Sequence, residues 1–147
     1  MMKRHAPTTV WQVPEGFRTT YAHAVEVRAG ARVLLISGQI GVAPDGAVPS
    51  GFSDQCDRAM TNVEELLVAA DMAISDIVKV NYYLTRSEDL PALGEARTRR
   101  WKSDSPPAVT TLVVAALARP NLLVEIEVTA ASGKPSAADS SRSSRSN

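Results

Sequence analysis

Apolar side chains recur at every second position in several stretches of the chain, which is the period of a β-strand. The clearest stretch is Leu122–Ala131, where apolar residues share one face and Glu125, Glu127 and Thr129 share the other. Arg32–Ile40 is apolar at almost every position, which is typical of a strand buried on both faces. The patterns predict six strands, over Val10–Val13, Tyr21–Arg28, Arg32–Ile40, Ser75–Arg86, Val109–Ala115 and Leu122–Ala131.

Two other stretches have the spacing of an amphipathic helix. The first follows a turn at Pro44–Gly46 and covers residues 53–72, with Ser53 as the expected N-cap. Its apolar stripe consists of Cys56, Met60, Val63, Leu67 and Ala70. The second helix spans Leu90–Trp101, with Pro91 in the first turn, where proline is tolerated.

These elements predict a two-layer α+β domain with two helices on one face of a mixed sheet. The other face of such a sheet needs cover, which self-association supplies most easily in a small domain. A chain of 147 residues, 44% of them apolar, is enough for one domain and its core. We expect this domain over residues 1–132, compact from about Val10. The Ser-rich residues 133–147 have almost no large apolar side chains, which predicts a disordered tail.

Charge and composition narrow the classes of function. Sixteen basic residues balance 16 acidic ones, so the chain shows no electrostatic footprint for nucleic acid or an anionic membrane. A lone Cys56 and two histidines cannot supply a disulfide framework, a cysteine-rich zinc site or a three-histidine zinc site. The start of the chain lacks the apolar core of a signal peptide, and no apolar run nears the roughly 20 residues that span a bilayer. We therefore expect a cytoplasmic protein without a membrane partner, a nucleic-acid partner or a metal.

Four side chains could act as a base or a nucleophile. His23 on a predicted strand is more typical of a structural histidine, and Ser37 of a turn at a strand end. Cys56 lies on the apolar stripe, which favours an inert buried thiol. Glu125 lies in a strongly apolar strand, where a carboxylate can act as a general base that positions water. The pattern alone favours the simpler interpretation, that Glu125 and Glu127 mark the solvent-facing side of the sheet.

Short motifs throughout the compact region resemble the Rid family of reactive-intermediate deaminases, also called the YjgF family. Each motif alone is weak, but together they occur in the order and spacing of the family. They are Tyr21 with Ala24-Val25, Ile36-Ser37-Gly38-Gln39-Ile40, Gln55 with Asn62, Asp76-Ile77-Val78-Lys79-Val80, Pro107-Ala108 and Val124-Glu125-Ile126-Glu127-Val128. The resemblance implies a chorismate-mutase-like fold, a homotrimer, and clefts for a small molecule between the subunits.

Characterised members of that family hydrolyse reactive imines and enamines, such as 2-aminoacrylate, to 2-oxo acids and ammonia. A glutamate in the last strand positions water there and matches Glu125, so the resemblance favours a catalytic role for this residue. It also implies substrate-binding positions at Tyr21, Gly38, Val109 and Thr111. Such hydrolysis needs only a positioned water and proton transfer, so no cofactor is implied.

Two positions depart from the family's pattern. The arginine that grips the substrate carboxylate follows the Pro-Ala pair in the family, but Val109 stands there in this chain. The asparagine of the second helix falls on Gly94. A guanidinium gives a carboxylate two charge-assisted hydrogen bonds, and losing such a desolvated partner costs about 2 to 5 kcal/mol. The departure implies weak or absent activity on small 2-imino acids. Either the substrate is a larger or less acidic imine, or Arg97 or Arg119 supplies the cation from another direction.

Two functions therefore stay open. The first is a hydrolytic deaminase of a reactive imine or enamine, with a specificity altered from small 2-imino acids. The alternative is a non-catalytic trimer that binds a metabolite in the same cleft. Ribonuclease activity has also been attached to the family, but the neutral charge and the lack of a basic-aromatic patch disfavour it here.

Overall fold

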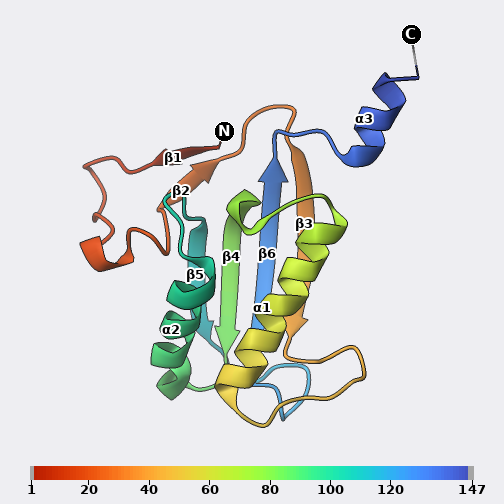
Figure 1. Ribbon diagram of the computed structural model, residues 1–147. Helices are drawn as coiled ribbons and strands as arrows, with labels where there is room; N and C mark the ends of the chain where they lie inside the picture. The colour runs from red at the N-terminus through yellow and green to blue at the C-terminus, as the bar shows by residue number, and fades with distance from the viewer. Residues whose placement is uncertain (1, 146–147) are drawn as a thin grey trace.

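The computed structural model describes residues 2–145, so Met1 and the last two residues of the predicted tail lie outside it. Figure 1 shows the described elements along the chain. The strands are β1 (Lys3–His5), β2 (Ala24–Glu26), β3 (Arg32–Ile40), β4 (Ile77–Leu84), β5 (Ala108–Val113) and β6 (Val124–Ser132). The α-helices are α1 (Phe52–Ala69), α2 (Leu90–Trp101) and α3 (Ala137–Ser143). Short 3-10 helices are η1 (Glu15–Phe17), η2 (Ile74–Asp76) and η3 (Ser87–Asp89).

The main sheet has four strands in the order β3-β6-β4-β5. β4 and β5 are parallel because α2 carries the chain back between them, whereas β6 is antiparallel to both β3 and β4. The register between β3 and β6 shifts between Ile36 and Gln39, as in a β-bulge. β1 and β2 form a separate two-stranded ribbon, and a bridge from Ala22 to Ala108 connects the segment before β2 to β5.

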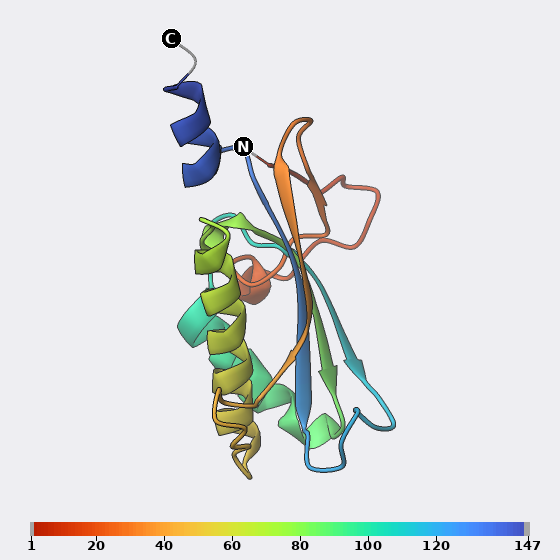
Figure 2. The same cartoon turned by 90° about the vertical axis from the view of Figure 1, so that its right-hand side faces the viewer.

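Helices α1 and α2 lie on the same side of the main sheet, and no α-helix of residues 2–145 covers its other side (Figure 2). The helix-covered side holds the core. Its strand residues Val80, Tyr82, Val124, Ile126 and Val128 are almost fully buried against α1 and α2. The predicted α+β fold with a mixed sheet and helices on one face is therefore confirmed. A homotrimer stays a prediction.

The residues of β3 and α2 are those that the sequence predicts, Arg32–Ile40 and Leu90–Trp101. The prediction of a strand at Val10–Val13 is wrong, because these residues pair with no strand and the Trp11 side chain is 75% exposed. The first strand is instead β1, which lies opposite β2 with Lys3 facing Glu26. Its Arg4 side chain secures it by donating from Nε to the Pro106 carbonyl oxygen at 2.9 Å.

Three smaller differences concern the extent of one strand, the start of one helix and the predicted tail. Only Ala24–Glu26 of the predicted strand Tyr21–Arg28 pairs as a strand. Helix α1 begins at Phe52 with Gly51 as its N-cap, so Ser53 is not the cap. Residues 137–143 of the predicted disordered tail form α3, which begins with reciprocal hydrogen bonds between Ser136 and Asp139. None of the α3 residues is buried, and the division of the chain at residue 132 stays a prediction.

Candidate active site

Glu125 lies on the open side of the main sheet, the side without an α-helix. It belongs to β6, with Ile40 of β3 and Tyr83 of β4 as its partners in register. Its carboxylate fills the space beside Gly38: a Cβ added to Gly38 would lie 2.7 Å from Glu125 Cδ. The bulge in β3 thus lets two predicted site residues, Gly38 and Glu125, meet, because glycine leaves room for the carboxylate.

Other polar side chains of β4 and β6 surround Glu125. Asn81 Nδ2 donates to Glu127 Oε1 at 2.7 Å, and the Tyr83 hydroxyl donates to the same oxygen at 3.2 Å. Partial burial and the Glu127 and Glu125 carboxylates raise the pKa of the Tyr83 hydroxyl. Glu127 is therefore held by neighbours, whereas the Glu125 carboxylate makes no hydrogen bond to any residue that the structure describes. Glu125 remains available to a water molecule or a ligand.

A second group of predicted site residues gathers at the β5 edge. The Ala22 amide donates to the Pro107 carbonyl oxygen at 2.7 Å, which holds the neighbouring Tyr21 beside the Pro107-Ala108 motif. The Tyr21 ring contacts two other rings, with its centroid 6.5 Å from that of Phe17 and 6.1 Å from that of His23.

Val109 and Thr111 follow on β5, opposite Val80 and Tyr82 of β4. Both therefore belong to the helix side of the sheet. Val109 also packs against the core there. The two residues lie on the opposite side from Glu125.

Arg97 is occupied by contacts within the chain. Its Nη2 donates to the Thr20 carbonyl oxygen at 3.1 Å, and its guanidinium carbon lies 5.1 Å from the centroid of the Tyr82 ring. This arrangement supports the segment that carries Tyr21 rather than presenting a cation to solvent. Arg119, the other proposed replacement, is exposed in the loop between β5 and β6.

The two groups do not meet within one chain. Glu125 faces Tyr83 on β4, whereas Ala108, the contact point of the Tyr21 segment, faces Lys79. Four residues along a strand and two strand spacings separate Glu125 from Ala108, so their Cα atoms lie roughly 15 Å apart. A cleft that uses both Glu125 and Tyr21 needs residues from more than one copy of the chain.

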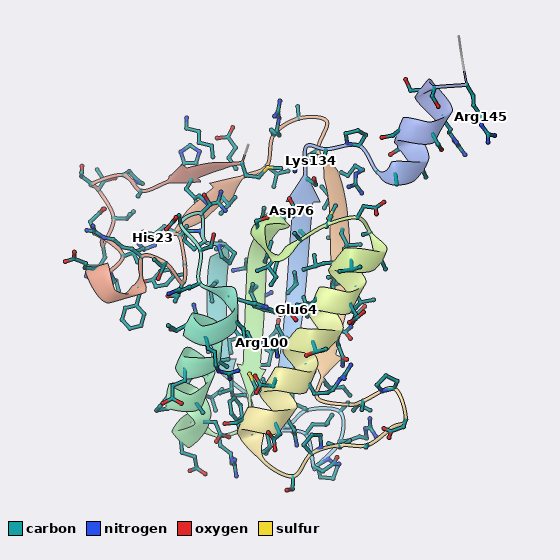
Figure 3. All side chains as sticks on the ribbon, viewed as in Figure 1. His23, Glu64, Asp76, Arg100, Lys134 and Arg145 are labelled. Carbon is teal, nitrogen blue, oxygen red and sulfur yellow. The ribbon has the colours of Figure 1, made fainter. Side chains whose placement is uncertain are left out.

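The contacts of the remaining candidate nucleophiles and bases, Cys56, His23 and Ser37, do not indicate a catalytic role. Cys56 is fully buried, and burial raises the pKa of its thiol to about 12, which keeps it protonated. His23 lies in the segment before β2 (Figure 3), where its Nε2 contacts the Trp11 carbonyl oxygen. Ser37 is exposed on β3, with its carbonyl oxygen accepting from Gln39 Nε2 at 3.0 Å.

Several motif residues serve the fold instead. The buried Gln55 amide donates to the carbonyl oxygens of Pro49 and Asn121 and accepts from the Leu123 amide. Asn62 Nδ2 donates to the Ile40 and Val42 carbonyl oxygens at 3.1 Å each, which ties α1 to the end of β3. These contacts explain the two motif positions without a catalytic role.

Charged residues also join the two helices. Figure 3 shows Arg100 of α2 and Glu64 of α1 facing each other, with Arg100 Nη2 2.7 Å from Glu64 Oε2. The Trp101 indole donates to the other Glu64 oxygen at 2.9 Å. Among residues 2–145, no group of His, Cys, Asp and Glu side chains has the arrangement of a metal site, and no helix is long and apolar enough to cross a membrane.

A cleft of about 320 Å³ opens beside Tyr21, within the lower range of small-molecule sites. Its walls come from the N-terminal segment and from the loop before β5, and they include Arg4, Val13, Arg18, Tyr21, Asp104 and Pro106. Neither Arg18 nor this cleft is predicted from the sequence pattern or the family motifs. The residues that form the walls are distant in sequence and follow no periodic pattern. They meet because β1 pairs with β2 and because Arg4 and Ala22 bind the carbonyl oxygens of Pro106 and Pro107.

The fold and the pairing of Glu125 with Gly38 define a two-layer α+β protein with a carboxylate site on the open side of its sheet. The family described as Endoribonuclease L-PSP matches residues 16–132. The chain belongs to this family, which is the Rid (YjgF) family that the motifs resemble.

Named relatives and solved structures agree with this assignment. The chain is 34% identical over 109 residues to a 2-iminobutanoate/2-iminopropanoate deaminase of Dermatophagoides farinae, covering 73% of this chain and 81% of the relative. It is 36% identical to a RutC family protein of Aquifex aeolicus, covering 86% and 98%. The crystal structure of the Rid family protein YyfB from Yersinia pestis superposes with a TM-score of 0.76 at 27% identity, covering 88% of this chain and 97% of that chain.

Proposed function

We propose that the protein is a hydrolytic deaminase of a reactive imine or enamine, with Glu125 as the general base. The observation that carries this proposal is the Glu125 carboxylate, which lies against Gly38 and has no hydrogen-bond partner within residues 2–145. The deaminase names of relatives that are 34% to 35% identical to this chain support the same class of reaction.

The proposed reaction adds one water molecule to a C=N bond. Glu125 accepts a proton as the water oxygen attacks the imine carbon, and the π electrons of the C=N bond move to nitrogen. Glu125 passes this proton to the nitrogen, which gives a carbinolamine. The C–N bond then breaks as the C=O bond forms, and the hydroxyl proton moves through Glu125 to the departing nitrogen, which leaves as ammonia. Imine and water give a 2-oxo compound and ammonia, so the atoms balance without an oxidant or a reductant. Glu125 is regenerated when its proton passes to the leaving nitrogen.

The proposed site lies between copies of the chain in a homotrimer. Two observations support this: Tyr21 and Glu125 do not meet within one chain, and the open side of the sheet exposes apolar residues next to Glu125's strand. Leu35 and Val33 of β3 are 78% and 55% exposed. Another copy that covers this side would bury both and would place its own residues near Glu125. We further propose that the protein acts in the cytoplasm.

We propose a substrate other than the small 2-imino acids. Val109 offers no charge to a carboxylate, and it already packs against the core on the helix side of β5. The presence of valine where the family has its carboxylate-binding arginine also supports the alternative function, a trimer that binds a metabolite without turnover. Turnover therefore has to be measured for several imines.

Replacing Glu125 tests the proposal. An amino-acid oxidase generates imino acids in place from a panel of small and bulky amino acids, while semicarbazide competes for the imine. We expect the protein to speed ammonia release from the imino acids with bulky side chains. Glu125→Gln should lower this rate of ammonia release by about 10²- to 10⁴-fold. Glu127→Gln is the matched control, since Glu127 lies on the same side of β6 but is held by Asn81 and Tyr83.

Sedimentation of the wild type and both variants shows whether assembly is retained. We expect a mass of three copies in each case. Full turnover by Glu125→Gln would remove Glu125 as the base. A wild type that binds oxo acids but releases no ammonia from any imine would instead favour the binding trimer.

A further inference from the structure

The cleft beside Tyr21 contains a cation that the fold does not use. We propose that Arg18 binds the carboxylate of a 2-imino acid with a bulky side chain in this cleft, in place of the arginine that Val109 replaces. This inference rests on the proposed function and adds the substrate class and the residue that selects it. Arg18 lies on the rim with Tyr21, three residues away in sequence, and its side chain lines the same cleft.

The other cations near the cleft are already occupied. The Arg4 guanidinium donates to the carbonyl oxygens of Met2, Ser105 and Pro106. His5 Nε2 lies 2.6 Å from the Glu26 carboxylate, and His23 contacts the Trp11 carbonyl oxygen. Among residues 2–145, the Arg18 guanidinium makes no hydrogen bond or ion pair. It can therefore give a carboxylate two parallel hydrogen bonds without breaking any contact of the fold.

The other walls of the cleft suit an apolar side chain on the ligand. Val13, Pro106 and the Tyr21 ring all line it, and a volume of about 320 Å³ exceeds what a three-carbon acid would fill. Asp104 also lines the cleft and brings a negative charge. That charge repels an oxo acid but suits the protonated nitrogen of an imino acid, so the cleft presents both signs that an iminium carboxylate carries.

The cleft depends on a part of the chain outside the family's shared region. Residues 16–132 match the family, whereas the wall residues Arg4 and Val13 and the strand β1 precede that range. The pairing of β1 with β2 brings this segment against the loop that holds Pro106. A specificity that differs from the family's small substrates is consistent with a wall that the family match does not include.

Calorimetric binding to the full-length protein tests the inference without requiring turnover. The probe is 2-oxo-3-phenylpropanoate, the product that hydrolysis of the matching imine would give, and its methyl ester and pyruvate are the comparison ligands. We expect Arg18→Ala to weaken binding of the phenyl acid by about 10- to 100-fold, the usual effect of losing hydrogen bonds to a charged group. Arg18→Lys should keep part of the affinity, because a point charge remains.

Two further variants give the effect a sign and a control. Asp104→Asn should strengthen binding of the phenyl acid several-fold, since it removes a like charge from the cleft. Arg28→Ala removes the same charge as Arg18→Ala from an exposed position that does not line the cleft, and it should leave binding unchanged. The uncharged methyl ester should bind the wild type and Arg18→Ala equally.

Either of two results would overturn the inference: equal binding of the phenyl acid to wild type and Arg18→Ala, or binding of pyruvate as tight as that of the phenyl acid. These results are separate from the fate of the proposed function. Binding that depends on Arg18 together with no ammonia release would keep the cleft and remove the enzyme. Turnover that depends on Glu125 but not on Arg18 would keep the enzyme and remove this cleft.

Discussion

Alternate side chains of β6 point to opposite sides of the main sheet, and the two sides differ in burial. On the helix side, Val124, Ile126 and Val128 are almost fully buried and contact α1 and α2. On the open side, Glu125 and Glu127 stand beside polar residues of β4, and apolar residues of β3 remain exposed. The same strand therefore contributes to a buried core on one side and to an open, partly apolar surface on the other.

The two sides of the sheet differ in how their polar groups are paired, which separates residues expected to stabilise the fold from residues proposed for activity. Polar groups on the helix side are paired within the chain, as the three hydrogen bonds of Gln55 show. On the open side, the Glu125 carboxylate lacks such partners among residues 2–145. Changes on the helix side should therefore alter stability, and changes on the open side should alter activity or assembly.

The largest stability effect is expected from Gln55→Leu. The leucine would leave the Leu123 amide and the carbonyl oxygens of Pro49 and Asn121 without their Gln55 partner in a partly buried region. We expect a loss of about 3 to 5 kcal/mol, because each unpaired buried group costs about 1 to 3 kcal/mol. Urea unfolding at one fixed protein concentration measures it.

Asn81→Leu on the open side is the matched control for Gln55→Leu. It removes one hydrogen bond, to Glu127, which also accepts from Tyr83 and can accept from water. We expect its cost to stay below about 1 kcal/mol. Equal losses in the two variants would contradict the distinction between the faces.

Gly41, directly after β3, gives a stability effect of intermediate size. A Cβ at Gly41 would lie 2.6 Å from Gln55 Cα and from Gln55 O, which are backbone atoms and cannot turn aside. We expect Gly41→Ala to cost about 1 to 3 kcal/mol of stability in urea unfolding, the usual cost of overpacking. Its effect on turnover per folded molecule should be small.

Gly38→Ala should show the opposite behaviour. The three atoms nearest to its Cβ would all belong to the Glu125 side chain, which can rotate away. We expect a stability change below about 1 kcal/mol but a 10- to 100-fold loss of ammonia release, since a carboxylate displaced by about 1 Å is misplaced for catalysis. A Gly38→Ala protein that is unstable but fully active per folded molecule would reverse the assignment of the two faces.

The sequence predicts the helix side well for a physical reason. The alternation in Leu122–Ala131 and the apolar stripe of Cys56, Met60, Val63 and Leu67 record burial that happens within one chain. Period and composition carry that information directly. The ends of elements are harder to predict, as the N-cap of α1 shows: it is Gly51, which has no side chain to signal a cap, rather than Ser53.

The N-terminal segment and the candidate site could not be predicted in the same way. β1 has only three residues, and its place depends on Arg4 reaching the Pro106 carbonyl oxygen about a hundred positions away in sequence. The pattern alone assigned Glu125 to solvent, and only the family resemblance pointed to a site. Neither periodicity nor the family motifs indicate Arg18, because its position matters only once the cleft has formed.

Neighbouring tyrosines on opposite faces of β4 sharpen the comparison through pH. Burial, only partly opposed by Arg97, raises the pKa of Tyr82 far above its ordinary value of 10.0. The unfolded chain releases this proton near pH 10 while the folded chain keeps it, so the stabilising contribution is complete below pH 10 and is lost as pH rises further. We expect the free energy of unfolding to fall by about 1.4 kcal/mol per pH unit from this group. Tyr82→Phe should remove that component.

Tyr83→Phe is the control on the open face, where the pKa is raised by partial burial and by the Glu127 and Glu125 carboxylates. Cys56 adds a further loss of stability above its ordinary pKa of 9.0 in the wild type and in both variants, so it cancels when they are compared. The free energy of unfolding in urea, measured between pH 9 and 11, should therefore depend much less on pH in Tyr82→Phe than in Tyr83→Phe. Equal slopes for the two variants would mean that Tyr83 is as fully buried as Tyr82, so that another copy of the chain sits directly on Tyr83 and leaves no open cleft beside Glu125.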